Sequence, residues 1–156
     1  MNTVFLPSYS VGSDVYNQIP KVCGAYGKTA VVIGGKTAIS KAKDALLAGV
    51  HNSNIEIIDF IWYGGDSTYA NIKKLAQNPQ FQKADMVFAV GGGRAIDTCK
   101  TLCDMENKPV FSFPTIASNC SPVTAVCVIY DDETHGFKEL YFPQKKALYI
   151  ALLIQK

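Results

Sequence analysis

The chain has 156 residues, of which 48% are hydrophobic and 18% are charged. This composition supplies enough apolar material for the core of one domain and excludes a disordered or fibrous protein. The formal net charge is +2 and the basic residues are scattered, so we expect no nucleic-acid partner.

Several features predict a cytoplasmic protein without a membrane partner. No apolar run approaches the roughly 20 residues that a membrane span needs. Residues 1–6 lack the basic segment and the long apolar stretch of a signal peptide. The five cysteines are an odd number, which argues against a disulfide framework.

The sequence predicts no metal site. Cys99 and Cys103 lie four residues apart and would share a helix face, so they could in principle hold a metal. Packing as small hydrophobic residues is the favoured interpretation, because no further Cys or His has the spacing of a zinc site. His51 and His135 are too isolated to support a metal site.

Apolar periodicity predicts strands and helices in alternation. Helical spacing of apolar residues predicts helices over residues 14–23, 38–49, 72–76 and 95–103. Short apolar runs that end at Gly or Pro predict strands over residues 29–33, 55–62, 86–90 and 110–113. Three successive strand–helix–strand units favour an α/β fold, a Rossmann-like parallel sheet with helices on both faces. Beyond them, residues 123–130 and 137–142 flank a polar stretch, which predicts a C-terminal β-hairpin.

The predicted ligand site lies where the strands end, because parallel α/β sheets bind ligands outside the carboxyl ends of their strands. Gly91, Gly92 and Gly93 stand between a predicted strand and a predicted helix. They can expose backbone N–H groups at a helix N-terminus, where a diphosphate would bind. A plain turn that binds nothing is the alternative. The common dinucleotide fingerprint is absent, since no third glycine follows Gly34 and Gly35 at the required spacing.

One stretch resembles a known family. Residues 91–100, GGGRAIDTCK, resemble the GGGxxxDxxK signature of the iron-containing (group III) alcohol dehydrogenases. Residues 113–118, FPTIAS, and 122–130, PVTAVCVIY, are most similar to the glycerol dehydrogenase branch. The resemblance implies a dehydroquinate synthase-like N-terminal domain that binds NAD or NADP over residues 1–143. Residues 144–156 are expected to be a divergent apolar tail.

The resemblance also implies roles for individual residues. The pyrophosphate would lie on Gly91, Gly92, Gly93 and Arg94. The nucleotide site would be lined by Thr115 and Ser118, and the nicotinamide and its ribose by Thr124, Val126 and Tyr130. Asp97 would face the site, although a simple surface pair with Lys100, three residues on, is the alternative. Lys100 is interpreted as structural.

Two departures from the family pattern concern specificity. Gly35, followed by Lys36, stands where many glycerol dehydrogenases carry an Asp that binds the adenosine ribose, so use of NADP or of both cofactors is a hypothesis. Cys120 stands where the family has an Asp that touches the polyol. A thiol cannot reproduce that acceptor, which favours another small alcohol or an oxo acid as substrate. A packed turn residue is the alternative role for Cys120.

The third departure concerns the metal. In this family a helical second domain binds a divalent metal, Zn or Fe, through one Asp and two or more His, and no such ligands occur in this chain. A truncated gene product would explain the missing C-terminal helical metal-binding domain.

The family activity is reversible hydride transfer between a secondary alcohol, a polyol or a 2-hydroxy acid, and nicotinamide. We expect this chain to be the cofactor-binding half, inactive alone, and we assign no residue of it a catalytic role, which stays unknown. The alternative is a non-catalytic cofactor-binding or self-associating remnant domain, in which the apolar run of residues 147–154 would favour a homo-oligomer. A dehydroquinate synthase-like lyase is the least favoured.

Overall fold

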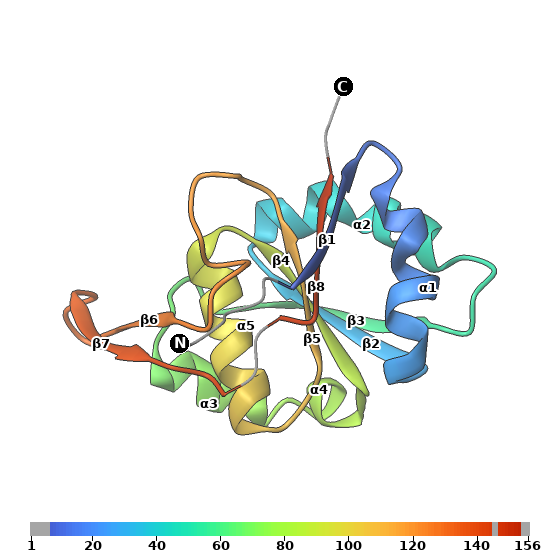
Figure 1. Cartoon of the computed structure of the whole chain (residues 1–156). Coiled ribbons are helices and arrows are strands. Elements are labelled where there is room, and N and C mark those ends of the chain that lie inside the picture. Colours follow the sequence, from blue (N-terminus) through green and yellow to red (C-terminus); the bar gives the residue numbers. More distant parts are fainter. Residues whose placement is uncertain (1–6, 145–146, 154–156) are drawn as a thin grey trace.

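The computed structural model describes residues 7–144 and 147–153, and its central feature is a six-stranded parallel sheet (Figure 1). The strand order is β1-β8-β5-β4-β2-β3. The strands are β1 (Ser8–Gly12), β2 (Thr29–Gly34), β3 (Glu56–Trp62), β4 (Met86–Gly91), β5 (Val110–Pro114) and β8 (Tyr149–Leu153). All pairings in this sheet are parallel, as the sequence predicts.

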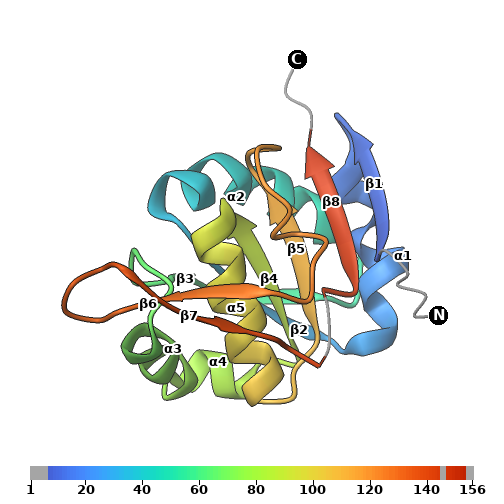
Figure 2. The same ribbon diagram turned by 60° about the vertical axis from the view of Figure 1, so that its left-hand side comes forward.

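Helices cover both faces of the sheet (Figures 1 and 2). On one side lie η1 (Val15–Gln18), α1 (Ile19–Cys23), η2 (Gly24–Tyr26) and α2 (Lys36–Val50). On the other lie α3 (Tyr69–Ala76), α4 (Pro79–Lys83) and α5 (Gly93–Met105). The alternation of β2 explains the two layers, because Val32 packs with Leu46 of α2, whereas Val31 packs in the cluster that holds Ile96 of α5. The predicted α/β architecture is confirmed.

The predicted C-terminal hairpin is also present, with a shorter first strand. It consists of β6 (Cys127–Tyr130) and β7 (Phe137–Tyr141), which pair antiparallel, and β6 lies against α5 (Figure 2). Residues 123–126 were predicted to belong to this strand and do not. The carbonyls of Thr124 and Val126 instead accept hydrogen bonds from the Lys100 ammonium.

Two strands were not predicted. β1 and β8 pair with each other, and β8 also contacts β5, so residues 149–153 of the segment set apart as an apolar tail lie inside the sheet. Ala147, Tyr149, Ile150 and Ala151 are buried in this chain's own core. Residues 147–152, the part of this segment whose exposure the structure describes, therefore offer no continuous exposed run for the self-association that the sequence analysis considered. Residues 145–146 and 154–156, and residues 1–6 where a signal peptide was sought, lie outside the described residues.

Within the described ranges, no helix combines the length and the apolarity that crossing a bilayer requires.

Candidate nucleotide-binding site

The carboxyl ends of β2, β4 and β5 lie side by side, because these strands are neighbours in the sheet. β2 ends at Gly34, where an added Cβ would lie 2.0 Å from the carbonyl oxygen of Val90. β4 ends at Gly91, whose φ of +144° is a conformation that side chains rarely allow. Two of the glycines predicted to mark this edge are thus required by backbone geometry.

The N-terminus of α5 opens onto this edge without a side-chain cap. Gly92 is the N-cap residue, and its carbonyl accepts from Ile96 N at 3.1 Å. The first four N–H groups of a helix have no intrahelical partner and carry the positive end of the helix dipole. A Cβ at Gly92 would lie 3.2 Å from Ile116 Cδ1, so the bare backbone forms a narrow cradle beside the following loop. Such a cradle fits the diphosphate of a dinucleotide.

Two pockets adjoin the carboxyl edge of the sheet. The first, of about 450 Å³, is lined by Tyr16, Thr37, Ala38, Lys41, Ala42, Pro114, Thr115 and Ile116. The second, of about 480 Å³, is lined by Gly93, Arg94, Asp97, Asn119, Cys120, Ser121, Thr124, Val126, Val128 and Tyr130. The first thus includes residues at the end of β5, and the second includes Gly93 and Arg94 at the start of α5.

The structure gathers most of the predicted site residues around these pockets. Those in the second pocket are Gly93, Arg94, Asp97, Cys120, Thr124, Val126 and Tyr130. Thr115 lines the first pocket, and Gly91 and Gly92 form the turn between β4 and α5. Ser118 is an exposed residue of the loop that joins β5 to β6. The Lys36 ammonium lies over the Trp62 ring, 4.3 Å from its centroid.

Asp97 and Lys100 are a buried pair, so the surface pair considered from the sequence is wrong. Asp97 is 7% exposed and Lys100 is 1% exposed. The Asp97 carboxylate accepts a hydrogen bond from Ser121 Oγ at 2.5 Å and another from the backbone N–H of Val128 at 2.9 Å. Both side chains are bonded to residues 121–128, which follow α5 in the chain. The spacing of Asp97 and Lys100 on one helix gives no sign of these contacts.

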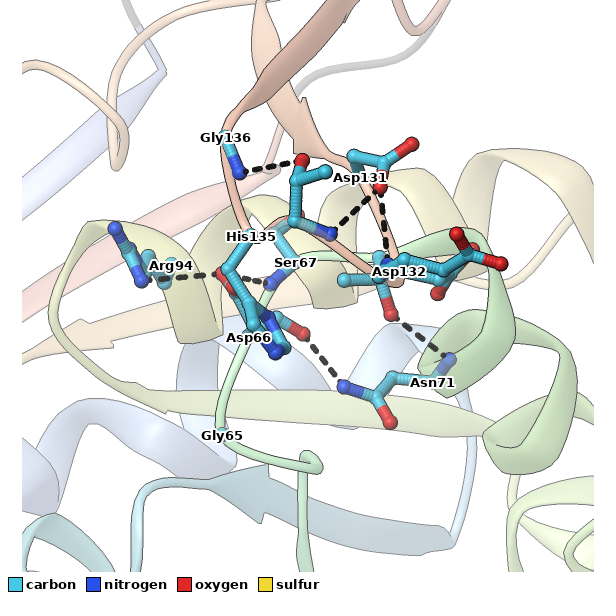
Figure 3. Close-up of polar contacts among 12 residues, drawn as sticks. Gly65, Asp66, Ser67, Asn71, Arg94, Asp131, Asp132, His135 and Gly136 are labelled. Carbon is cyan, nitrogen blue, oxygen red and sulfur yellow. Dashed lines mark hydrogen bonds and ion pairs between the residues drawn. The ribbon is translucent and has the colours of Figure 1, made fainter.

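Arg94 contacts both an acidic group, Asp66, which Figure 3 shows, and the aromatic ring of Tyr130. Its Nη1 is 3.3 Å from Asp66 Oδ1, and its guanidinium carbon is 4.3 Å from the centroid of the Tyr130 ring. The other oxygen of the Asp66 carboxylate is 3.3 Å from His135 Nδ1. Asp66 therefore links Arg94 of α5 to His135 in the turn of the hairpin.

Sequence reasoning named Arg94 and Tyr130 but missed Asp66 and His135. Asp66 follows the two glycines after β3 and so stands at the same sheet edge, which is the one signal that could have indicated it. His135 was judged isolated, yet the hairpin turn brings it to Asp66 across 69 residues of chain. No local pattern in the sequence marks that contact.

The cysteines divide into one exposed and four buried thiols. Cys120 is exposed at the second pocket. Cys99 and Cys103 pack between α5 and the sheet, as predicted for small hydrophobic residues, and burial raises the pKa of both thiols. Burial also raises the pKa of Cys127 to about 11 and that of Cys23 to about 12. Over residues 7–144 and 147–153, no three His, Cys, Asp or Glu side chains gather as a metal site would require.

Comparison with known proteins points to one family. Residues 7–154 match the profile described as iron-containing alcohol dehydrogenase. The chain is 26% identical over 142 residues to a glycerol dehydrogenase of Escherichia coli O6:H1, covering 91% of this chain and 38% of that protein. It is 31% identical over 147 residues to a glycolaldehyde reductase of Halobacterium salinarum, covering 91% of this chain and 39% of that protein.

A solved structure shares the fold. A probable glycerol dehydrogenase from Sinorhizobium meliloti superposes with a TM-score of 0.83 at 19% identity, covering 98% of this chain and 41% of that one. The chain thus spans about 40% of the length of the relatives cited here.

Proposed function

We propose, on the premise that this chain belongs to the iron-containing alcohol dehydrogenase family, that its α/β unit binds NAD or NADP at the carboxyl edge of the sheet. The observation that carries the proposal is the uncapped N-terminus of α5, where Gly92 leaves room for a ligand against the backbone. The N–H groups that follow Gly91 bind the two phosphates, which places the negative charge at the positive end of the helix dipole.

The two pockets then take the two ends of the dinucleotide. The adenosine lies in the first pocket, where the Thr115 and Thr37 hydroxyls can bind its ribose. The nicotinamide lies in the second, between Val126 and the hydroxyls of Thr124 and Tyr130. When bound, the nicotinamide ring exchanges a hydride with the carbon of the alcohol. Ser118 contributes a hydroxyl from the loop between β5 and β6.

Specificity would be set at the two outer ends of the site. Lys41 supplies positive charge in the first pocket. Gly35, followed by Lys36 at the start of α2, offers no carboxylate to repel a 2′-phosphate, so NADP is a candidate alongside NAD. Cys120 faces the substrate, a small secondary alcohol or the corresponding oxo compound.

The metal of the family does not fit the described residues, which provide no cluster of ligands for it. We propose that this chain binds the cofactor but does not by itself oxidise alcohols. Assays with NAD, Zn²⁺ or Fe²⁺ and a panel of diols test this, and clear turnover would contradict it.

Calorimetric titration with NADH, NADPH and ADP-ribose tests cofactor binding. We expect all three to bind the wild-type chain and Gly92→Val to weaken each at least tenfold, about 1.4 kcal/mol, because the new side chain occupies the phosphate cradle. Gly24→Ala is the matched control, since a Cβ there meets nothing within 4 Å. If the wild-type chain binds none of the three ligands, the proposal is overturned.

A further inference from the structure

The second pocket is bounded by a loop with little regular structure of its own. Residues 115–126, between β5 and β6, form no helix or strand. Inside the loop, the N–H groups of Val123 and Thr124 both donate to Cys120 O, at 3.0 and 3.2 Å. Most of the remaining bonds that fix its second half come from α5.

Lys100 supplies three of these bonds. Its ammonium donates to Ser121 O at 2.8 Å, to Thr124 O at 3.0 Å and to Val126 O at 2.8 Å. An ammonium has three N–H donors, so the three carbonyls use all of them. Asp97 Oδ1, 3.2 Å away, supplies the compensating charge that a buried cation requires.

Asp97 accepts two further hydrogen bonds from the same segment. One carboxylate oxygen accepts from Ser121 Oγ and the other accepts from Val128 N. The pair on α5 thus holds the main chain at residues 121, 124, 126 and 128, each of which also lines the second pocket. In a strand, hydrogen bonds to a neighbouring strand would hold this segment; here hydrogen bonds to side chains of α5 hold it instead.

We propose that the buried Asp97–Lys100 pair is a positioning device that sets the nicotinamide end of the cofactor site. The inference rests on the proposed function and extends it to Lys100, which does not line the pocket. Without the Lys100 ammonium, the carbonyls of Thr124 and Val126 lose the hydrogen bonds that hold them. Both residues then move, and with them the part of the pocket wall that contacts the nicotinamide. The first pocket is lined by residues from η1, α2 and segment 114–116, so its shape does not depend on the pair.

The test compares two ligands that differ only in the nicotinamide group. Lys100→Met is titrated calorimetrically with NADH and with ADP-ribose, and its fold is checked by circular dichroism. We expect the affinity for NADH to fall about tenfold, the effect of losing about 1.4 kcal/mol. We expect the affinity for ADP-ribose to stay within about twofold, because that ligand lacks the group that the loop positions.

Lys108→Met is the matched control. The Lys108 ammonium also donates to backbone carbonyls, those of Gln82 and Ala84, but these lie where β4 begins, at the opposite edge of the sheet. Both affinities should be unchanged in this variant.

If Lys100→Met does not fold, Ser121→Ala decides the question. It removes the hydroxyl that Asp97 binds and keeps the carbonyl that Lys100 binds, so we expect a loss for NADH alone of about threefold. Equal losses for both ligands, or no loss for NADH, would overturn the inference. Failure of the wild-type chain to bind ADP-ribose would instead overturn the proposed function.

Discussion

The contact between β2 and β4 at the nucleotide edge predicts very unequal effects on stability for substitutions of two adjacent glycines. In Gly34→Ala, the new Cβ would lie 2.0 Å from Val90 O, whereas ordinary contact begins at 3.4 Å. The two strands would have to separate by 3.4 − 2.0 = 1.4 Å, and neither contact atom is the flexible end of a side chain. In Gly35→Ala, the new Cβ lies 3.9 Å from Ala38 Cβ, which is an ordinary contact.

The size of the effect follows from these contacts. Overpacking a well-packed site costs about 1–3 kcal/mol, and displacing Val90 O also weakens its bond from Gly35 N, worth about 1 kcal/mol. Gly34→Ala should therefore lower the free energy of unfolding by about 2–4 kcal/mol. Gly35→Ala should change it by less than about 1 kcal/mol, because the loss of N-cap preference is offset by the lower entropy of the unfolded chain.

Urea denaturation followed by circular dichroism measures both variants, with the wild-type chain alongside. Both substitutions lower the conformational entropy of the unfolded chain by a similar amount. The difference between their free energies of unfolding therefore isolates the contact with Val90. Equal midpoints for Gly34→Ala and Gly35→Ala would refute the close approach of β2 and β4.

Three further predictions concern single side chains. Asp66→Asn should weaken NADH binding about threefold in calorimetry, because Arg94 loses a partly exposed ion pair worth up to about 1 kcal/mol; an unchanged affinity would separate Asp66 from the site. Iodoacetamide should alkylate Cys120 well before the buried thiols, and NADH should slow that reaction, as peptide mass spectrometry will show; modification of Cys99 first would contradict the burial pattern. Asp85 has a pKa lowered below its ordinary value of 3.8, chiefly by hydrogen bonds from the backbone N–H groups of Lys28 and Thr29. The wild-type chain should therefore be more stable than Asp85→Asn above pH 4, and this advantage should vanish as the pH falls through the lowered pKa of the folded state; thermal melts in which the difference grew at acid pH would contradict this.

The central strands could be predicted because both of their faces are buried. Residues 29–33, 86–90 and 110–113 are largely apolar runs that stop at Gly or Pro, a pattern typical of buried parallel strands. β1 could not be predicted in this way, because Tyr9 and Val11 of this edge strand are exposed and no apolar run marks it. β8 is apolar, but its place in the sheet depends on β1 and β5, which lie far from it in sequence.

The site could be predicted where local geometry determines it. The backbone conformation of the turn between β4 and α5 requires glycine, so a short sequence motif is enough to identify the turn. The contacts of Lys100 with residues 121–126, and of Asp66 with His135, join segments that only the tertiary fold brings together. The spacing of Asp97 and Lys100 identified the pair, but it could not indicate that a loop covers it.

Backbone amide NMR during titration with ADP-ribose tests the central claim most directly, because that claim concerns N–H groups rather than side chains. We predict that the largest shifts occur at Gly92, Gly93, Arg94 and Ala95, at the start of α5, with smaller shifts at Thr115. Saturable binding that leaves those amides unchanged and moves resonances of α3 or β7 instead would contradict the assignment of this turn to the diphosphate.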